Sequence, residues 1–243
     1  MTLIHSKSKL IERVEVQSVV TPEASDTWHP IPHDWLLDLI ASNVGELGLK
    51  ISNEKFALAR DGQRFFGTMD LTNCNNATDY RLVLGIRNSH DKSFPAGLCV
   101  GSRVFVCDNL AFSSKITIAR KHTRFIMRDL PALVNTAMGK LGGMRLTQDN
   151  RIQAYKAREI SNEQAHDVVV RALDSRIIST TQIPDVLTEW RTPRHNDFKP
   201  RTAWSLFNAF TEHMKGTNPW KLTKRTTALH GLVDQVAMIA QSN

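Results

Sequence analysis

Two short stretches in the middle of the chain carry side chains that could do chemistry. Residues 88–91 (Asn-Ser-His-Asp) contain the hydroxyl, imidazole and carboxylate of a hydrolase triad, and Cys107 with His90 or His122 would pair a thiol with an imidazole. Adjacent residues rarely converge on one point, which disfavours the first set. The second set depends on how the fold places distant residues. We expect no enzymatic activity, and a metal-dependent or Cys/His-dependent enzyme stays open as an alternative.

The sequence lacks the motifs that bind common cofactors and metals. It contains no GxxxxGK[ST] phosphate loop, no GxGxxG after a strand and no HExxH helix. Cys99 and Cys107 are eight residues apart with no second pair, which is not zinc spacing. We therefore predict no cofactor and no metal site.

Basic residues gather in one segment of a basic chain. The 243 residues have a net charge of +7, and residues 113–158 contain ten Lys or Arg against two Asp. Such an excess favours polyanions, because each neutralised phosphate releases counterions. A solvated helix face is the alternative interpretation, and it applies equally to a second basic run at residues 215–225. The predicted nucleic-acid contacts in the first segment are Lys115, Arg120, Lys121, Arg124 and Arg128.

Arginines on predicted strands add Arg81, Arg87 and Arg103 to the predicted nucleic-acid contacts. A strand register that places them on one face with Arg64 and Phe66 would make a basic and aromatic platform. Single-stranded nucleic acid binds to such surfaces. The alternative is that the aromatic side chains belong to the core and the arginines line its edge.

The elements that must position these residues are strands in the first half of the chain. Leu36, Leu39 and Ile40 recur at helical spacing and predict one helix that begins near His33. Strands are then predicted on both sides of Asp61-Gly62, the favoured two-residue hairpin turn. Alternating apolar residues predict a further strand at residues 80–88, and residues 96–109 supply one or two more.

Helical spacing dominates the second half. The predicted helices cover residues 131–141, which Gly142-Gly143 would end, a segment after the Ser161–Gln164 capping box, a short segment after Pro184, residues 202–215 and residues 223–240. This order predicts an α+β fold, with an antiparallel sheet of about four or more strands in the first half and a helical second half. We expect an N-terminal arm (1–30), a helix plus sheet core (31–128) and a helical region packed on the sheet (129–243), in one continuous domain.

Composition is that of a globular protein, with 41% apolar and 23% charged residues. No run approaches the roughly 18 apolar residues that a membrane span needs, and the N-terminus has no apolar signal core. The three cysteines fit reduced thiols. We therefore expect a soluble protein of the bacterial host cytoplasm with no membrane partner.

Residues 88–91 (Asn-Ser-His-Asp), 103–109 (Arg-Val-Phe-Val-Cys-Asp-Asn) and 121–123 (Lys-His-Thr) form a pattern in the middle of the chain. This pattern resembles that of the phage/plasmid-like protein family, which is domain-of-unknown-function family 932. That family pairs an Asn-Ser-His-Asp turn with a strand ending in Arg-Val-x-x-Cys-x-Asn, followed by Lys-His-Thr. The matching positions here are Asn88, Ser89, His90, Asp91, Arg103, Val104, Cys107, Asn109, Lys121, His122 and Thr123. Residues 202–213 are similar to the family's C-terminal helix, with Trp204, Asn208 and Glu212 in place. The resemblance covers roughly residues 30–235.

The resemblance implies a protein carried by phages, plasmids or other mobile elements, with no established reaction and no catalytic residue to carry over. A remote relationship to single-strand annealing recombinases is an analogy at the level of the fold. The family-signature corner comprises Asn88, His90, Asp91, Cys107, Asn109 and His122. We interpret it as architectural: Asn88 and Asp91 would cap the turn between strands, Asn109 would cap a strand end, and His122 would hydrogen-bond the corner.

The leading hypothesis is a nucleic-acid-binding accessory protein of a phage or other mobile element, related to single-strand annealing or replication, with single-stranded DNA as partner. An interaction protein that inhibits a host defence complex is the alternative, with a host protein as its target. A homo-oligomer is a further expectation, because an open sheet invites edge pairing.

Overall fold

Strands in the first half of the chain form one antiparallel sheet, and helices make up the second half. The computed structural model describes residues 10–72, 80–104, 109–215, 217 and 219–239. Within these residues, six strands pair in sequence order. They are β1 (Leu10–Ile11), β2 (Lys50–Ala59), β3 (Arg64–Thr72), β4 (Tyr80–Ser89), β5 (Ala96–Val104) and β6 (Leu110–Arg120). The predicted α+β class is confirmed.

The β2–β3 hairpin turns at Asp61-Gly62, as predicted, but the connection between the paired residues Ala59 and Arg64 has four residues instead of the predicted two. Asp61 and Gly62 have φ angles of 51° and 83°, and the Gln63 amide donates to the Arg60 carbonyl at 3.0 Å. Positive φ at both central residues gives the turn a twist that matches paired strands, and glycine adopts it without strain. The turn sets the register of β2 against β3.

Alternation along β4 divides the sheet into two faces. The first face carries Leu82, Leu84 and Ile86, all of them buried, as the sequence predicted. The second face carries the intervening residues, among them Arg81 and Arg87. Residues paired across neighbouring strands share a side, so the sheet has an apolar first face and a mixed second face.

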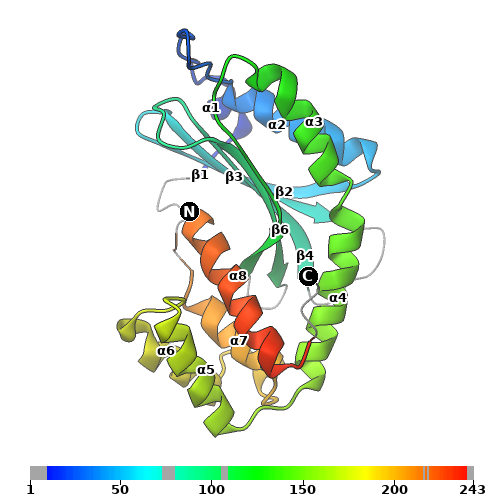
Figure 1. Ribbon diagram of the computed structural model, residues 1–243, viewed down its shortest axis with the longest axis vertical. Coiled ribbons are helices and arrows are strands. Elements are labelled where there is room, and N and C mark those ends of the chain that lie inside the picture. Colours follow the sequence, from blue (N-terminus) through cyan, green and yellow to red (C-terminus); the bar gives the residue numbers. More distant parts are fainter. Residues whose placement is uncertain (1–9, 73–79, 105–108, 216, 218, 240–243) are drawn as a thin grey trace.

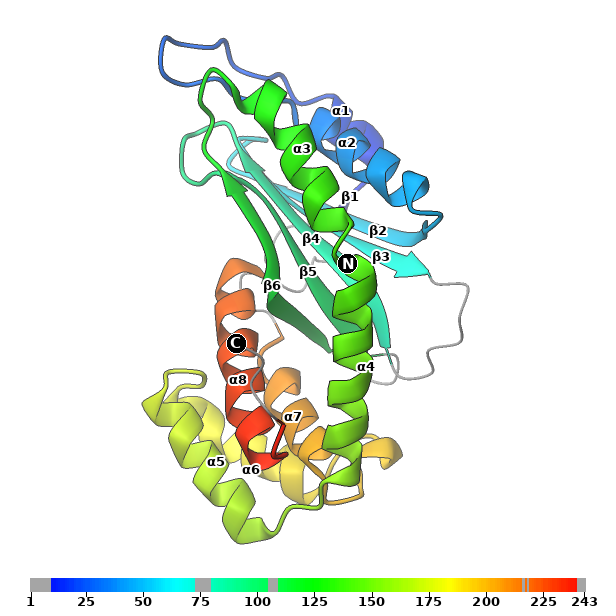
Figure 2. The ribbon, with the colours of Figure 1, turned by 45° about the vertical axis from the view of Figure 1, so that its right-hand side comes forward.

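Helices cover the first face, and one helix covers part of the second. The helices α2 (His33–Glu46) and α3 (Ile126–Met138) lie over the first face, with α1 (Arg13–Gln17) beside α2 (Figure 1, Figure 2). The helix α8 (Pro219–Val236) packs on the second face near β6, where Thr223 Oγ1 lies 3.8 Å from Cys99 Sγ. The core therefore has two layers of helices around the sheet.

Phe112 of β6 packs on the second face, against Gly85 of β4 and Gly101 of β5 and beside α8. A Cβ atom on Gly85 or on Gly101 would lie 2.8 Å or 2.7 Å from its ring, so both positions require glycine. Thr226 of α8 accepts the Phe112 amide hydrogen bond at 3.1 Å, and its hydroxyl lies 2.9 Å from the Phe112 carbonyl oxygen. The edge of the sheet is thus capped within the chain at this residue, and edge pairing between copies would need other residues.

The second half contains α4 (Leu141–Ala157), α5 (Asn162–Asp174), α6 (Ile183–Arg191), α7 (Ala203–Glu212) and α8, with short 3₁₀ turns η1 (Thr180–Gln182) and η2 (Asn196–Phe198). The Ser161–Gln164 capping box forms as predicted, with hydrogen bonds of 3.2 and 3.0 Å. The short helix after Pro184 and the two C-terminal helices are also present, within a few residues of their predicted bounds.

The prediction that Gly142-Gly143 ends a helix is wrong. The helix α3 ends earlier, at Met138, and both glycines lie in the first turn of α4, a helix that the sequence analysis missed. Each glycine costs a helix about 1 kcal/mol relative to alanine. Burial of Met144, Ile152 and Tyr155 along one side of α4 offsets that cost.

No helix in the described part of the chain is both long and apolar enough to cross a membrane.

Candidate functional site

Asn88 is the centre of a buried hydrogen-bonded cluster at one end of β4. Its side-chain amide donates to the Ile31 carbonyl at 2.8 Å and to His33 Nδ1 at 2.9 Å. Its side-chain oxygen accepts from His122 Nε2 at 2.7 Å. His90 Nε2 donates to the same Ile31 carbonyl at 2.9 Å, and all four side chains are buried. We call Asn88, His33, His90 and His122 the corner cluster.

The hydrogen bonds of the corner cluster fix the tautomers of its histidines. His33 Nε2 faces the Gly62 carbonyl at 2.9 Å and must donate, which leaves Nδ1 to accept from Asn88. His90 and His122 likewise carry the proton on Nε2. The His33 and His90 rings stack with centroids 3.9 Å apart. His90 Nδ1 is buried without a hydrogen-bond partner in the described part of the chain.

Burial keeps the histidines of the corner cluster neutral. Burial, together with the neighbouring imidazoles, lowers the pKa of His33 to about 3 and that of His122 to about 4. Burial also lowers the pKa of His90. None of these rings is protonated at neutral pH, so the cluster is a polar anchor without charge. It ties the segment before α2 and the end of β6 to the sheet.

The residues next to the cluster do not form a triad. Ser89 Oγ donates to the Phe94 carbonyl at 2.7 Å, and the Asp91 carboxylate accepts from Arg64 Nε at 2.6 Å and from the Ser93 amide at 3.1 Å. Asp91 therefore caps the turn after β4, as predicted. Asn88 does not: it lies within β4 and bonds to residues far away in sequence, because its side chain points to the first face.

The corner cluster positions an exposed group of aromatic and basic side chains. The Trp28 ring centroid lies 6.4 Å from that of His122, and the His29 amide donates to the His122 carbonyl at 2.9 Å. Lys92 Nζ lies 4.9 Å from the Trp28 ring centroid. Lys121 is the neighbour of His122 in the chain and is exposed. These contacts place two lysines and an indole on one corner of the molecule.

Phe125 completes this corner at the start of α3. Its side chain is 40% exposed, and the guanidinium carbons of Arg124 and Arg128 lie 4.5 and 4.3 Å from its ring centroid. Arg128 also pairs with Asp129, as does Arg120. Lys121 and Arg124 have no carboxylate partner in the described part of the chain. We call the group of Trp28, Lys92, Lys121, Arg124, Phe125 and Arg128 the basic corner.

The strand arginines share the second face, with Arg64 and Phe66, as the register hypothesis required. They do not form an open platform. Arg103 is buried and pairs with Asp70 at 3.1 Å, and Arg81 lies 3.5 Å from the same carboxylate. Arg87 is buried over the Phe94 ring, and burial lowers its pKa to about 10.

Two positions among the predicted contacts and signature residues lie outside the described residues or side chains. Residues 114–116, including Lys115, bulge from β6 between the partners of Cys99 and Val100, and the Lys115 side chain is not described. Cys107 lies outside the described residues.

The arginines of the second face lie across the sheet from α3, which carries Arg128. The predicted contacts therefore do not line one surface.

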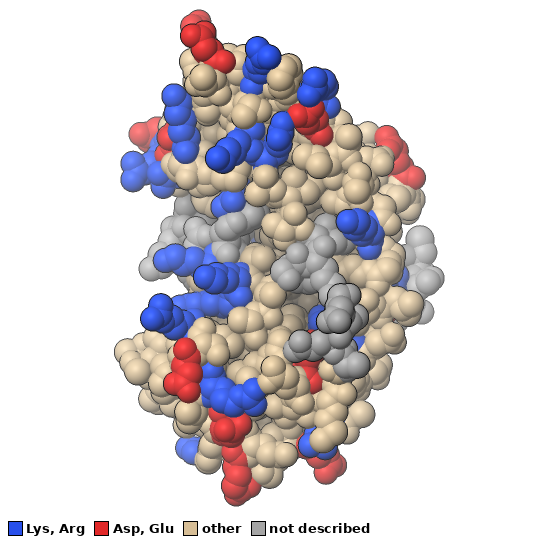
Figure 3. Space-filling view, in the orientation of Figure 1, with Lys and Arg blue, Asp and Glu red and all other residues tan. Residues whose placement is uncertain are grey.

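The first turns of α8 carry a second exposed group of cations. Lys221 and Lys224 are exposed and Arg225 is half-buried, with no carboxylate partner in the part of the chain that the structure describes. Figure 3 shows a patch of basic side chains at the edge beside the start of α8, on the same face as basic side chains around the start of α3. We call these three residues the α8 group. The sequence run 215–225 signalled them, although they were not among the predicted contacts.

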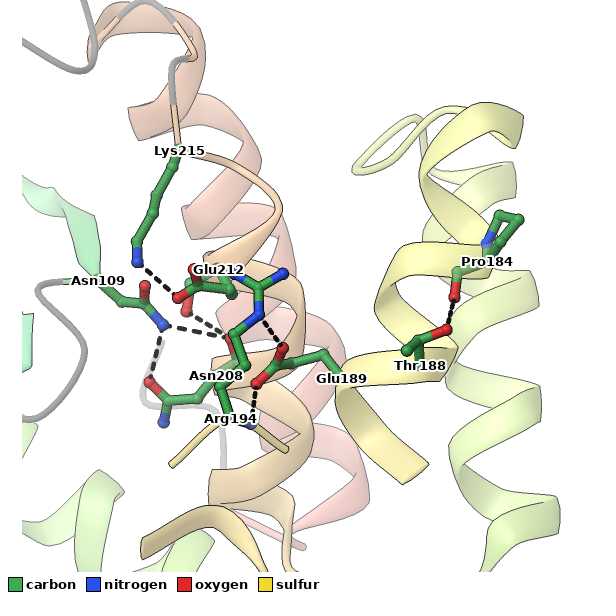
Figure 4. A network of polar contacts seen from close by, with 9 residues as sticks. Asn109, Pro184, Thr188, Glu189, Arg194, Asn208, Glu212 and Lys215 are labelled. Carbon is green, nitrogen blue, oxygen red and sulfur yellow. Dashed lines mark hydrogen bonds and ion pairs between the residues drawn. The ribbon is translucent and has the colours of Figure 1, made fainter. Parts of the chain in front are cut away.

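Three further signature residues, Asn109, Asn208 and Glu212, lie where β6 joins the helical region (Figure 4). Asn109 Nδ2 donates to the Asn208 carbonyl and side-chain oxygens at 3.3 and 3.4 Å. One turn further along α7, Glu212 pairs with Arg194 at 3.0 Å and with Lys215 at 2.6 Å. Arg194 also pairs with Glu189 at 3.1 Å, so the cations here are paired with carboxylates.

Sequence analysis missed a buried polar cluster between α4 and α8. Arg151 donates to both oxygens of Asp234 at 3.0 and 3.2 Å, and the Tyr155 hydroxyl donates to Asp234 at 2.7 Å. His230 lies 3.3 Å from that hydroxyl, and burial lowers its pKa well below the usual value. We call these four residues the ion-pair cluster. The sequence signals it only through two spacings of four residues, Arg151 to Tyr155 and His230 to Asp234.

The described residues contain no group of three or more His, Cys, Asp or Glu side chains that could hold a metal ion. A model of the family described as "Domain of unknown function (DUF932)" matches residues 22–234. No curated protein and no solved structure matches the chain significantly. The match covers most of the chain and includes both segments on which the resemblance rested. The chain therefore belongs to the DUF932 family.

Proposed function

We propose that this chain binds nucleic acid, as an accessory protein of a phage or another mobile element. The observation that carries the proposal is that exposed cations without carboxylate partners among the described residues gather at two places, at Lys121 and Arg124 in the basic corner and at Lys221 and Lys224 in the α8 group. Unpaired cations on one face attract the phosphate backbone and release its counterions. The mobile-element setting comes from the family resemblance.

The arrangement of α8 supports a continuous contact surface. Thr223, in the first turns of α8, touches Cys99, and Cys99 pairs with Thr117 of β6. Four residues beyond Thr117, the chain reaches Lys121 in the basic corner. At about 3.3 Å per strand residue, the path from Thr117 to Lys121 is on the order of 13 Å, which is about four phosphate steps of ~3.4 Å along one strand.

Cations at the start of α8 are also electrostatically unfavourable in the free protein. The amino-terminal end of a helix carries partial positive charge, and the first turn of α8 has no acidic residue. Lys221, which lies in that turn, therefore stabilises this helix less than an acidic residue would. A bound phosphate would reverse that balance, because helix amino-termini favour anions.

The test is binding of labelled oligonucleotides of about 20 nucleotides, at about 50 mM and about 200 mM salt. Two variants remove the cations, Lys121→Ala with Arg124→Ala in the corner and Lys221→Ala with Lys224→Ala in α8. We expect each to weaken binding at least tenfold at the lower salt and to reduce its salt dependence. The matched control replaces two exposed cations elsewhere, Arg176→Ala with Lys199→Ala. No binding at low salt, or equal losses in the control, would overturn the proposal.

A protein partner is the second candidate function, as expected of a factor that inhibits a host complex. Exposed apolar side chains favour it: Met127 and Leu133 on α3 are 46% and 41% exposed, and Leu146 on α4 is 64% exposed. The test is capture from host lysate after nuclease treatment, with Leu133→Lys and Leu146→Lys as the matched variant. One stoichiometric protein that the variant no longer captures would support this candidate.

A further inference from the structure

We infer that the nucleic acid bound by the basic corner is single-stranded, and that Phe125 and Trp28 stack against its unpaired bases. This inference rests on the proposed function, and it adds the class of nucleic acid and the side chains that select it. Cations alone do not discriminate, because single strands and duplexes both present phosphates. Aromatic side chains do, because only unpaired bases offer free ring faces.

Phe125 is the first of these side chains. The ring is 40% exposed immediately before α3, and two guanidinium groups lie within 4.5 Å of its centroid. Exposed aromatic area is unfavourable in water, and Arg124 has no carboxylate partner in the described part of the chain, whereas Arg128 pairs with Asp129. A base with its phosphate would relieve both: the base stacks on the ring or a guanidinium plane, and the phosphate neutralises charge.

Trp28 is the second aromatic side chain of this inference. It is partly exposed, carries Lys92 at 4.9 Å from its ring, and lies beside His122. The hydrogen bond from the His29 amide to the His122 carbonyl fixes the backbone next to Trp28. His122 belongs to the corner cluster, so the buried signature residues hold the indole and the turn before Phe125 in place. Positions fixed before binding lower the entropy cost of stacking.

Duplex DNA does not fit this arrangement. Its bases are already stacked on each other, and inserting a side chain between base pairs costs a few kcal/mol for each unstacked step. A single strand pays little to turn a base outward, and base–aromatic stacking contributes about 1–3 kcal/mol per base. The alternative role for Phe125 is to cover the methylene stems of Arg124 and Arg128, with no contact to a ligand.

The experiment compares an oligothymidylate with an abasic oligomer of equal length, which keeps the sugar and phosphate but removes the bases. A matched duplex and an oligouridylate complete the set and distinguish double from single strands and DNA from RNA. We expect the wild-type chain to bind the oligothymidylate at least tenfold more tightly than the abasic oligomer at the same salt. Phe125→Leu should lower the oligothymidylate affinity about five- to tenfold and leave the abasic affinity unchanged.

The controls separate this inference from the proposed function. Leu133→Ala changes another exposed apolar residue of α3 and should leave all four affinities unchanged. Equal wild-type affinities for the oligothymidylate and the abasic oligomer would overturn the inference and leave the proposed function intact. So would tighter binding of the duplex. Absence of binding to every oligomer would overturn both. The wild-type comparison decides the question even where Phe125→Leu fails to fold.

Discussion

The corner cluster and the ion-pair cluster both bury polar side chains, but they do so with opposite chemistry. The corner cluster joins an amide to three neutral imidazoles. The ion-pair cluster joins Arg151 to Asp234 and adds a tyrosine and a histidine. Each ties helices or loops to their neighbours. Only the ion-pair cluster contains a carboxylate, that of Asp234. In the same half of the molecule, Glu189 and Glu212 pair with Arg194.

This difference shows why the two ends of the molecule offer different surfaces. The corner cluster contains no carboxylate to pair with Lys121 and Arg124. The carboxylates nearby, Asp91 and Asp129, pair with other arginines instead. Carboxylates at the helical end cancel the charge of Arg151 and Arg194 over a few ångströms. Charge density along the sequence therefore does not identify a binding surface, because pairing decides which cations are available to a ligand.

Removing the centre of the neutral anchor should have the largest effect. Asn88→Ala leaves His33 Nδ1 and His122 Nε2 buried without partners, and we expect it to lower the free energy of unfolding by about 3–5 kcal/mol. Urea unfolding measures this loss, with the exposed Asn196→Ala as control. A loss below about 1 kcal/mol would show that the corner cluster relaxes to satisfy its polar atoms.

Breaking the ion-pair cluster should cost somewhat less. Asp234→Asn removes the carboxylate that Arg151 binds through two hydrogen bonds, and the Arg151 side chain is only 13% exposed. We expect a loss of about 2–4 kcal/mol in urea unfolding. The double variant Arg151→Met with Asp234→Leu should lose less than the single variant, because it leaves no unpaired charge. A larger loss in the double variant would contradict the ion-pair account.

Acid should weaken the corner cluster in a defined range of pH. The folded-state pKa values of His33 and His122 are about 3 and about 4, below the ordinary value for histidine. The unfolded chain therefore binds protons at higher pH than the folded chain does. Stability is fully present above about pH 6.5 and falls as pH decreases toward the folded pKa values, by about 1.4 kcal/mol per pH unit for each histidine.

His230 of the ion-pair cluster is also neutral, so acid weakens both clusters and a variant must separate them. We expect His122→Gln to reduce the slope of unfolding free energy between about pH 6 and about pH 4.5 by one proton. Proton titration by NMR gives a direct check, since the buried rings should stay neutral well below the ordinary pKa of histidine. A normal titration of His122 would contradict the assignment.

The smallest effect is expected at a paired cation on the surface. Arg194 is 60% exposed and bridges Glu189 and Glu212, so Arg194→Ala should lower stability by about 1 kcal/mol. It should leave nucleic-acid affinity unchanged, in contrast to Lys121→Ala with Arg124→Ala. Equal losses of affinity from both changes would mean that total charge, rather than unpaired charge, controls binding.

Local patterns predicted the sheet well because they report local energies. The Asp61-Gly62 turn, the alternation along residues 80–88 and the Ser161–Gln164 capping box each depend on residues a few positions apart. The end of the helix at Gly142-Gly143 was wrong for the same reason. Burial of the apolar side of α4 outweighs the cost of two glycines, and the pattern of glycines does not contain that burial.

The candidate site was predictable in residue type but not in arrangement. The sequence identified the basic segment, the signature residues and the run that contains the α8 group. It did not show that Arg103 and Arg151 are neutralised by Asp70 and Asp234. Nor did it show that Phe125 would lie exposed between arginines.

The sequence by itself determined the α+β class, the main turn and caps, the excess of positive charge and the family. Only the tertiary structure decided which polar groups meet. Asn88 and His33 are 55 residues apart in the sequence. The ion-paired residues Arg151 and Asp234 are also far apart in the sequence. Hydrogen bonds and ion pairs act over a few ångströms, so their contribution depends on positions that only the assembled fold defines.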